Sequence, residues 1–157
     1  MKLIDTNSLI VLIIGLMNPE KIKGHKRTSI YDENDFHDLV QIIENYESIV
    51  TLPNIWTEVD NLLNDKFKGE DKNLYVRQLI YLMKSTTEKY FESRRIEDME
   101  IPTVFYDLGL TDALILECAK QCDLLITSDS RLSDYARAYG IKVYDMKDLK
   151  SQKLETP

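Results

Sequence analysis

The sequence predicts an α/β fold, a three-layer arrangement in which helices cover both faces of a central parallel sheet. Two observations indicate it. Short apolar segments alternate with helical segments along the chain, and these apolar segments lack the polar and apolar alternation of a half-exposed strand. No internal repeat or Gly/Ser-rich linker divides the 157 residues, so a single domain is expected over 1–150, with a short C-terminal tail at 151–157.

In the first half of the chain, capping residues and a proline mark where strands give way to helices. The apolar opening at 2–5 stops at an Asp-Thr-Asn sequence, which suits the start of a helix. The β-branched run at 48–52 ends at Pro53, a residue that the first turn of a helix accepts. The elements expected here are a strand at 2–5, a helix at 8–16 capped by Thr6 or Asn7, a loop at 18–33, a helix from Asp32 or Asn34 to Tyr46, a strand at 48–52 and a helix from Pro53.

The second half continues the alternation, with glycines at two of the turns. Gly109 separates an extended segment from a helix, and Gly140 ends the helix before the last strand. The elements expected here are a long helix at 73–92, a charged connector at 94–100, an extended segment at 103–106, a helix at 111–122 capped by Thr111, a strand at 124–127, a helix at 132–139 and a strand at 141–144.

Three carboxylates are expected to meet at one edge of this sheet. Asp5 and Asp129 each follow a predicted strand, and ligands of open parallel sheets bind beyond the carboxyl ends of the strands. Asp112 lies in the first turn of a predicted helix, where the helix dipole favours a carboxylate. Glu58 and Asp60 both flank the apolar face of their helix, and spacing alone does not choose between them.

These acids predict a metal site made of oxygen ligands. No cysteine or histidine lies where it would join them, and carboxylates alone suit Mg²⁺ or Mn²⁺ better than zinc. An aspartate after a strand is also a common turn or capping residue. The prediction therefore depends on the joint placement of the acids and not on any one of them.

Four segments of the chain resemble the PIN-domain nucleases, a family that includes the toxins of VapBC-type toxin–antitoxin pairs. They cover nearly the whole chain in the family's order: Leu3–Asn7, Leu52–Glu58, Leu108–Ala113 and Leu125–Asp129. The resemblance implies a PIN-like fold and identifies Asp5, Glu58, Asp112 and Asp129 as the catalytic, metal-binding acids. It selects Glu58 over Asp60, and it implies supporting polar roles for Asn7 and Thr127.

The resemblance implies a metal-dependent endoribonuclease, which would be the toxin of a type II toxin–antitoxin pair. Bound Mg²⁺ or Mn²⁺ would activate water for attack on an RNA phosphodiester. The implied partners are the RNA substrate, an antitoxin protein and a second copy of the chain. The main alternative is a catalytically silent PIN-like module that binds RNA or protein. A phosphatase is disfavoured, because such sites need a lysine near the acids and none follows a predicted strand.

The charge distribution bears on how RNA would be held. The net charge of −7 argues against binding through bulk electrostatics. Lys23, Lys26 and Arg27 form a local basic cluster in the predicted loop and are the candidates for phosphate contacts. The alternative is that they belong to an ordinary solvated loop.

The remaining patterns indicate a cytoplasmic protein that does not enter a membrane. The two cysteines, Cys118 and Cys122, fit reduced thiols in a reducing compartment. The apolar run from Leu9 to Met17 is far shorter than the roughly 20 residues that span a bilayer. Since clustered carboxylates repel one another without a cation, Asp5→Asn is expected to raise the melting temperature of the metal-free protein.

Overall fold

The structure is a computed structural model that describes residues 1–97 and 102–155. Its centre is a five-stranded sheet in which all strands are parallel, in the order β3-β2-β1-β4-β5. The strands are β1 (Lys2–Ile4), β2 (Ile49–Thr51), β3 (Thr87–Glu88), β4 (Leu124–Thr127) and β5 (Val143–Asp145). The strand order reverses between β1 and β4, and sheets of this kind bind ligands at such a reversal.

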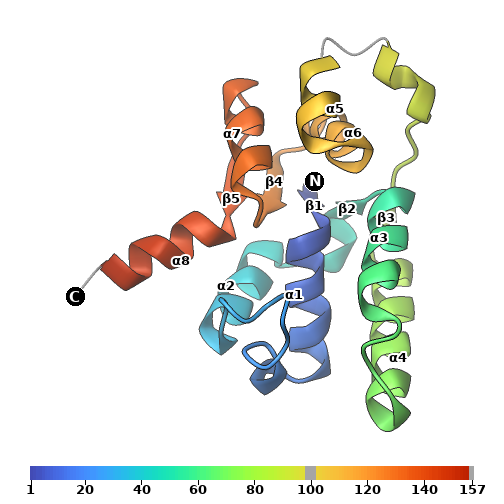
Figure 1. Ribbon diagram of the computed structural model, residues 1–157, viewed down its shortest axis with the longest axis vertical. Helices are drawn as coiled ribbons and strands as arrows, with labels where there is room; N and C mark the ends of the chain where they lie inside the picture. The colour runs from blue at the N-terminus through green and yellow to red at the C-terminus, as the bar shows by residue number, and fades with distance from the viewer. Residues whose placement is uncertain (98–101, 156–157) are drawn as a thin grey trace.

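Helices cover both faces of the sheet (Figure 1). One layer holds α1 (Thr6–Met17), α2 (Glu33–Ile43), α3 (Pro53–Leu63) and α4 (Gly69–Ser85). The other holds α5 (Pro102–Leu108), α6 (Leu110–Ala119) and α7 (Ser130–Ala138). These layers confirm the predicted three-layer α/β/α fold.

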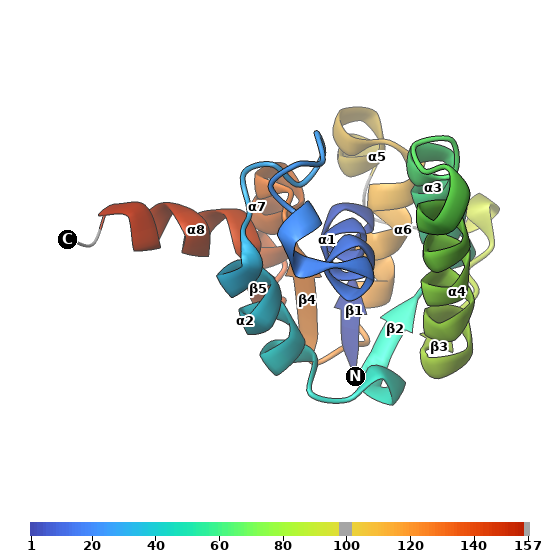
Figure 2. The same cartoon turned by 90° about the horizontal axis from the view of Figure 1, so that it is seen from below.

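Helix α1 lies at the centre of its layer, between α2 on one side and α3 and α4 on the other (Figure 2). Its residues from Leu9 to Ile14 are all buried, because the sheet and three helices surround them. At Gly15 the backbone lies so close to α2 that an added Cβ would stand 2.1 Å from the ring of Phe36. α1 is therefore the most enclosed helix of the layer, and it positions the residues that follow β1.

Two helix caps differ from the predicted ones. α1 begins at Thr6 and is capped by Asp5, not by Thr6 or Asn7. α6 is preceded by Gly109 with a φ of 89°, and the predicted cap Thr111 lies inside the helix. The predicted cap Asp32 of α2 is confirmed, within a capping box completed by Asp35. The predicted loop at 18–33 is irregular apart from one 3-10 turn at Pro19–Lys21.

Two predicted elements were wrong. Residues 103–106 are helical and belong to α5. Val104 is buried, whereas Phe105 and Tyr106 are exposed. The β-branched and aromatic residues of this run predicted an extended segment, because their exposure cannot be seen in the sequence. The predicted helix at 73–92 begins earlier, at Gly69, and ends at Ser85, after which Thr87 and Glu88 form the edge strand β3. Both β3 residues are exposed, so no apolar pattern marks this strand. A 3-10 helix, Ser93–Glu97, occupies the first part of the predicted connector at 94–100, and 98–100 lie outside the described residues.

The last helix, α8 (Met146–Glu155), runs across the predicted boundary at residue 150 and projects from the body of the molecule (Figures 1 and 2). Two of its lysines bind acids of α2 and of the α2 cap. Lys150 Nζ lies 2.6 Å from Asp32 and 2.8 Å from Asp35, and Lys153 Nζ lies 3.2 Å from Asp35 and 2.5 Å from Asp38. We call these five residues the α2–α8 ion-pair cluster. It fixes α8 to the domain.

No helix in the described part of the chain is long and apolar enough to cross a membrane. Both cysteines are free thiols, Cys118 buried and Cys122 half-buried.

Candidate functional site

Asp5 lies at the point where the strand order reverses. Its backbone N–H donates to the carbonyl of Ile126 at 2.9 Å, which continues the pairing of β1 with β4. Its side chain turns back to cap α1, with Oδ1 accepting from the Ser8 N–H at 2.7 Å. Only 3% of the residue is exposed. Burial raises the pKa of Asp5, while the hydrogen bonds it accepts oppose that rise.

Thr127, at the end of β4, connects Asp5 to the next acid. Its hydroxyl donates to Asp5 Oδ2 at 2.5 Å and accepts from the Asp129 N–H at 2.9 Å. The Ser128 N–H donates to the same Asp5 oxygen at 3.1 Å. The Thr127 hydroxyl therefore lies between the Asp5 carboxylate and the Asp129 backbone. The exposed Asn7 makes no hydrogen bond through its side chain within the described ranges.

The structure separates Glu58 from Asp60. Glu58 Oε2 accepts from the Thr6 hydroxyl, in the first turn of α1, at 2.9 Å. Asp60 instead accepts from the Tyr75 hydroxyl of α4 at 3.0 Å. The two acids therefore point to different helices, and only Glu58 lies beside the start of α1.

Asp112 is a second acid whose pKa is raised in the folded protein. It stands in the first turn of α6 and makes no hydrogen bond through its side chain with the rest of the described structure. Burial raises its pKa to about 7, and the charges of Asp129, Asp5 and Glu58 add to the rise. Four acids from four separate parts of the fold therefore act on one another, and we call them the acidic edge.

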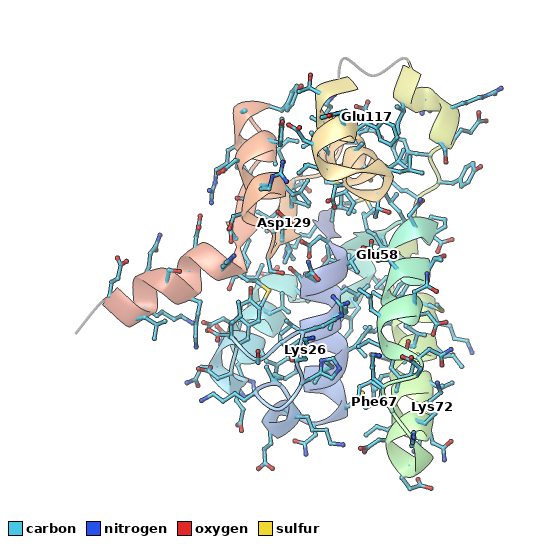
Figure 3. All side chains as sticks on the ribbon, in the orientation of Figure 1. Lys26, Glu58, Phe67, Lys72, Glu117 and Asp129 are labelled. Atoms are coloured by element: carbon cyan, nitrogen blue, oxygen red, sulfur yellow. The ribbon has the colours of Figure 1, made fainter. Side chains whose placement is uncertain are left out.

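Asp129 caps α7 with one oxygen, and its other oxygen accepts no hydrogen bond within 1–97 and 102–155. Its Oδ1 accepts from the N–H groups of Arg131 and Leu132, at 2.8 and 3.1 Å. Figure 3 shows Asp129 and Glu58 on opposite sides of the N-terminal turn of α1. The cap fixes the direction of the carboxylate, because both hydrogen bonds are made to the same oxygen.

The acidic edge has the donor set of a hard divalent cation but not a finished coordination sphere. Within residues 1–97 and 102–155, no three His, Cys, Asp or Glu side chains stand close enough together to hold a metal as they are. The uncommitted oxygens belong to Asp112, Asp129 and Glu58, while both oxygens of Asp5 accept hydrogen bonds. Oxygen-only donors fit Mg²⁺ or Mn²⁺, and a cation between these acids would offset the repulsion that raises the pKa of Asp112.

Asp145 is an acid of the same edge that the sequence prediction missed. It ends β5 and pairs with Thr127 of β4, so the two side chains share one face of the sheet. Its Oδ1 caps α8, whereas its buried Oδ2 has no hydrogen-bond partner in the described structure. Burial raises the pKa of the nearby Tyr31 to about 12, and Asp5 and Asp145 contribute. The position directly after a strand, which marked Asp5 and Asp129, also marks Asp145.

The basic cluster lies away from the start of α1. Lys23, Lys26 and Arg27 are exposed, and none forms an ion pair with an acid in the ranges that the structure covers. Figure 3 shows Lys26 below Asp129 and Glu58, along α1. Lys23 also borders a surface hollow with Glu20 and Asp32. The cluster is free to contact a bound polymer, but it does not touch the acidic edge.

A doubly wound parallel sheet with acids gathered at its reversal defines an α/β protein whose ligand site lies beyond the carboxyl ends of the strands. A family model for the PIN domain matches residues 28–138, more than half of the chain. The chain therefore belongs to the PIN-domain family, whose members are generally nucleases. Neither a search of curated proteins nor one of solved structures gave a match. The matched range includes Glu58, Asp112 and Asp129, and the fold places Asp5 beside them.

Proposed function

We propose that this protein is a metal-dependent endoribonuclease that hydrolyses RNA phosphodiester bonds with Mg²⁺ or Mn²⁺. The observation that carries the proposal is the placement of four acids at the reversal of the sheet, where Asp112 makes no side-chain hydrogen bond within the described residues and burial and the other three acids raise its pKa to about 7. Such a perturbation at a ligand-binding edge is typical of functional carboxylates. A purely structural acid would be expected to have a cationic or hydrogen-bonding partner.

The residues of the acidic edge would have different roles in metal binding. Asp112, Asp129 and Glu58 would hold the cation through their uncommitted oxygens, and Asp5 would complete the site from its fixed position. When bound, the cation supplies charge stabilisation at the phosphodiester and lowers the pKa of a coordinated water. Thr127 keeps Asp5 and the Asp129 backbone in register, and Thr6 orients Glu58.

Cleavage of mixed single-stranded RNA with Mn²⁺ or with EDTA tests the proposal. We expect internal cleavage with Mn²⁺ and none with EDTA. Activity that survives complete chelation would contradict a metal-dependent mechanism. Specific RNA binding without cleavage under every metal condition would instead favour a catalytically silent PIN-like module.

A choice between Glu58 and Asp60 can be made within one helix. Glu58→Gln and Asp60→Asn each remove one carboxylate charge from α3, but only Glu58 acts on Asp112. We expect Glu58→Gln to lower cleavage strongly, and Asp60→Asn to lower stability with little effect on the rate per folded molecule. An equal loss of rate in both would mean that the acids of α3 act only through the fold.

We further infer that the protein acts in the cytoplasm as the toxin of a toxin–antitoxin pair. An antitoxin segment would cover the acidic edge and place an Arg among the carboxylates, where a charge-assisted contact would replace the cation. Expression alone should then inhibit growth, and co-expression with the neighbouring gene should relieve the inhibition. A chain that is harmless alone but cleaves RNA in vitro would count against the toxin role.

A second copy of the chain is a further proposed partner. The supporting observation is an apolar stripe on α4, where Val76, Ile80 and Met83 are exposed at helical spacing. Light scattering of the purified protein should show a dimer, and Ile80→Glu should convert it to a monomer. A monomer in the wild-type protein at every concentration would contradict this.

A further inference from the structure

A groove lies between α5 and α7, on the layer that carries α6. It encloses about 360 Å³ and is lined by Asp107, Arg131, Asp134, Tyr135 and Ala138. The α7 residues among these are spaced as one face of a helix, which faces the end of α5 (Figure 1). We call it the α5–α7 groove.

The groove begins where the acidic edge ends. Asp129 caps α7, and the Arg131 N–H donates to Asp129 Oδ1 at 2.8 Å. Arg131 therefore occupies the first turn of the helix whose cap is one of the four acids. A polymer bound with a phosphodiester at the acidic edge would place a neighbouring nucleotide at this groove.

The side chains of the groove combine a flat ring with both kinds of hydrogen-bonding group. The Tyr135 hydroxyl donates to Asp107 Oδ2, which fixes the ring and leaves Asp107 Oδ1 without a partner in the described structure. Arg131 is exposed and forms no ion pair within the described residues. Its positive charge acts on Tyr135, since it lowers the pKa of that hydroxyl against the rise caused chiefly by the hydrogen bond to Asp107. Arg131 and Tyr135 lie four positions apart on α7 and both line the groove, and the guanidinium forms no ion pair in the described part of the chain.

The charges around the groove do not favour a phosphate as its occupant. Asp107 and Asp134 stand against Arg131 and against Arg137, which lies 4.0 Å from Asp134 Oδ1, so an anion gains no net attraction. A neutral planar base can stack on the tyrosine ring or the guanidinium while donating to carboxylates. Among the four RNA bases, guanine offers paired acceptors, O6 and N7, to an arginine and paired donors, N1–H and the N2 amino group, to a carboxylate.

We propose that the α5–α7 groove binds a guanine base of single-stranded RNA next to the bond that is cut. The proposal rests on the endoribonuclease function and adds a base-specific subsite to it. Arg131 would contact O6 and N7, Asp107 would accept from N1–H and the amino group, and Tyr135 would supply the stacking surface.

Cleavage of a sequence-randomised pool of single-stranded RNA with Mn²⁺ provides the first test. Sequencing the product ends should show guanine enriched at one fixed position beside the cut. Arg131→Gln should reduce that enrichment by about tenfold, the effect of losing one bidentate base contact. Arg77→Gln is the matched control, because it removes one exposed arginine from α4, in the other helix layer; it should keep the enrichment.

Base analogues assign the two contacts separately. In an oligonucleotide that contains the preferred guanosine, inosine lacks the amino group and 7-deazaguanosine lacks N7. Each substitution should slow wild-type cleavage by about tenfold. Asp107→Asn should respond little to inosine, and Arg131→Gln should respond little to 7-deazaguanosine. Full sensitivity of both variants to both analogues would overturn the assignment.

The outcomes separate the groove from the underlying function. Cleavage by the wild-type protein without any base preference, or a guanine preference that Arg131→Gln retains, would reject the groove and leave the nuclease function intact. If no RNA is cleaved, the nuclease function is contradicted, and the groove proposal is then tested by oligonucleotide binding. A metal-free protein that binds guanosine- and adenosine-containing oligonucleotides equally would then reject it as well.

Discussion

The protein has two clusters of carboxylates that differ in what compensates their charge. In the α2–α8 ion-pair cluster, Lys150 and Lys153 lie against the acids, and the hydrogen bond from Lys150 is the main cause that lowers the pKa of Asp32. In the acidic edge no lysine or arginine side chain pairs with the acids in the described part of the chain, and the pKa of Asp112 rises to about 7.

This difference distinguishes the acids that stabilise the fold from the acids whose charge is uncompensated until a ligand binds. Paired carboxylates contribute to stability when they are ionised, whereas repelling carboxylates reduce it. A protein keeps a destabilising arrangement where function requires it. The comparison therefore assigns the α2–α8 cluster to the fold and the acidic edge to function.

The largest expected effect is on catalysis. Asp112→Asn should lower RNA cleavage by about 100-fold or more, because it removes the carboxylate that is most open to a cation. Glu117→Gln is the matched control on α6, because Glu117 pairs with Lys120 and lies apart from the site (Figure 3). Initial rates at saturating Mn²⁺ measure both. Equal rates in Asp112→Asn and the wild-type protein would remove Asp112 from the mechanism.

The second prediction concerns pH and metal. The pKa of Asp112 rises from 3.8 to about 7 on folding, so the metal-free protein should lose stability as pH increases between these values and level off above them. Since the side chain is partly exposed, Asp112→Asn should gain only about 1 to 2 kcal/mol at neutral pH. Urea unfolding in EDTA across this range measures the slope.

Metal should reverse the order of stability of the wild-type protein and Asp112→Asn. Mn²⁺ should stabilise the wild-type protein more than Asp112→Asn, because a ligand that binds the native state raises its stability with affinity. Equal shifts of melting temperature in both would place the cation elsewhere.

Asp5→Asn should lower the stability of the metal-free protein, whereas Asp112→Asn should raise it. Repulsion alone favours a stabilising effect, as expected from the sequence. The structure shows that both Asp5 oxygens accept hydrogen bonds, from Ser8, Thr127 and Ser128. An amide would turn an NH₂ group toward one set of donors, so we now expect a loss of about 1 to 3 kcal/mol. A higher melting temperature in EDTA would show that repulsion dominates.

A smaller effect is expected at the α2–α8 cluster. Lys150→Ala should cost about 1 to 2 kcal/mol, since it leaves Asp32 and Asp35 less compensated. Lys147→Ala, on an exposed part of α8, is the control. The stabilisation is present above pH 3.8 and is lost as pH falls through the lowered pKa of Asp32. The two clusters should therefore give pH slopes of opposite sign, and a common sign would break the comparison.

The smallest effect is expected at the basic cluster. Changing Lys23, Lys26 and Arg27 together to alanine should weaken RNA binding and reduce the slope of log affinity against log salt by about 2. The rate at saturating RNA should change little, because these residues do not touch the acidic edge. An unchanged affinity for RNA at low salt would indicate that these three residues belong to an ordinary solvated loop.

The fold could be predicted because β1, β2 and β4 are mostly buried apolar runs with clear boundaries, and because Gly140 separates the half-buried β5 from the helix before it. β3 could not, since its two exposed residues pair at the sheet edge without apolar side chains. The aspartates after strands were predictable from topology, whereas Glu58 required the family pattern, because two acids of α3 have equivalent positions by spacing. Two of the three hydrogen bonds that fix the Asp5 side chain come from Thr127 and Ser128, which are distant in sequence, so no local pattern reveals them.

The close approach of α1 and α2 at Gly15 has a consequence for how the chain can vary. α1 carries Asp5 at its start, and Phe36 of α2 fills the space beside Gly15. Ten residues of helix put about 15 Å between Gly15 and Asp5. Any larger residue at Gly15 would push α1, which begins after Asp5 of the acidic edge, away from α2, which carries acids of the α2–α8 ion-pair cluster. A complete survey of substitutions should find Gly15 as intolerant as the acids, although it has no side chain to contribute, because the spacing between these helices is itself under constraint.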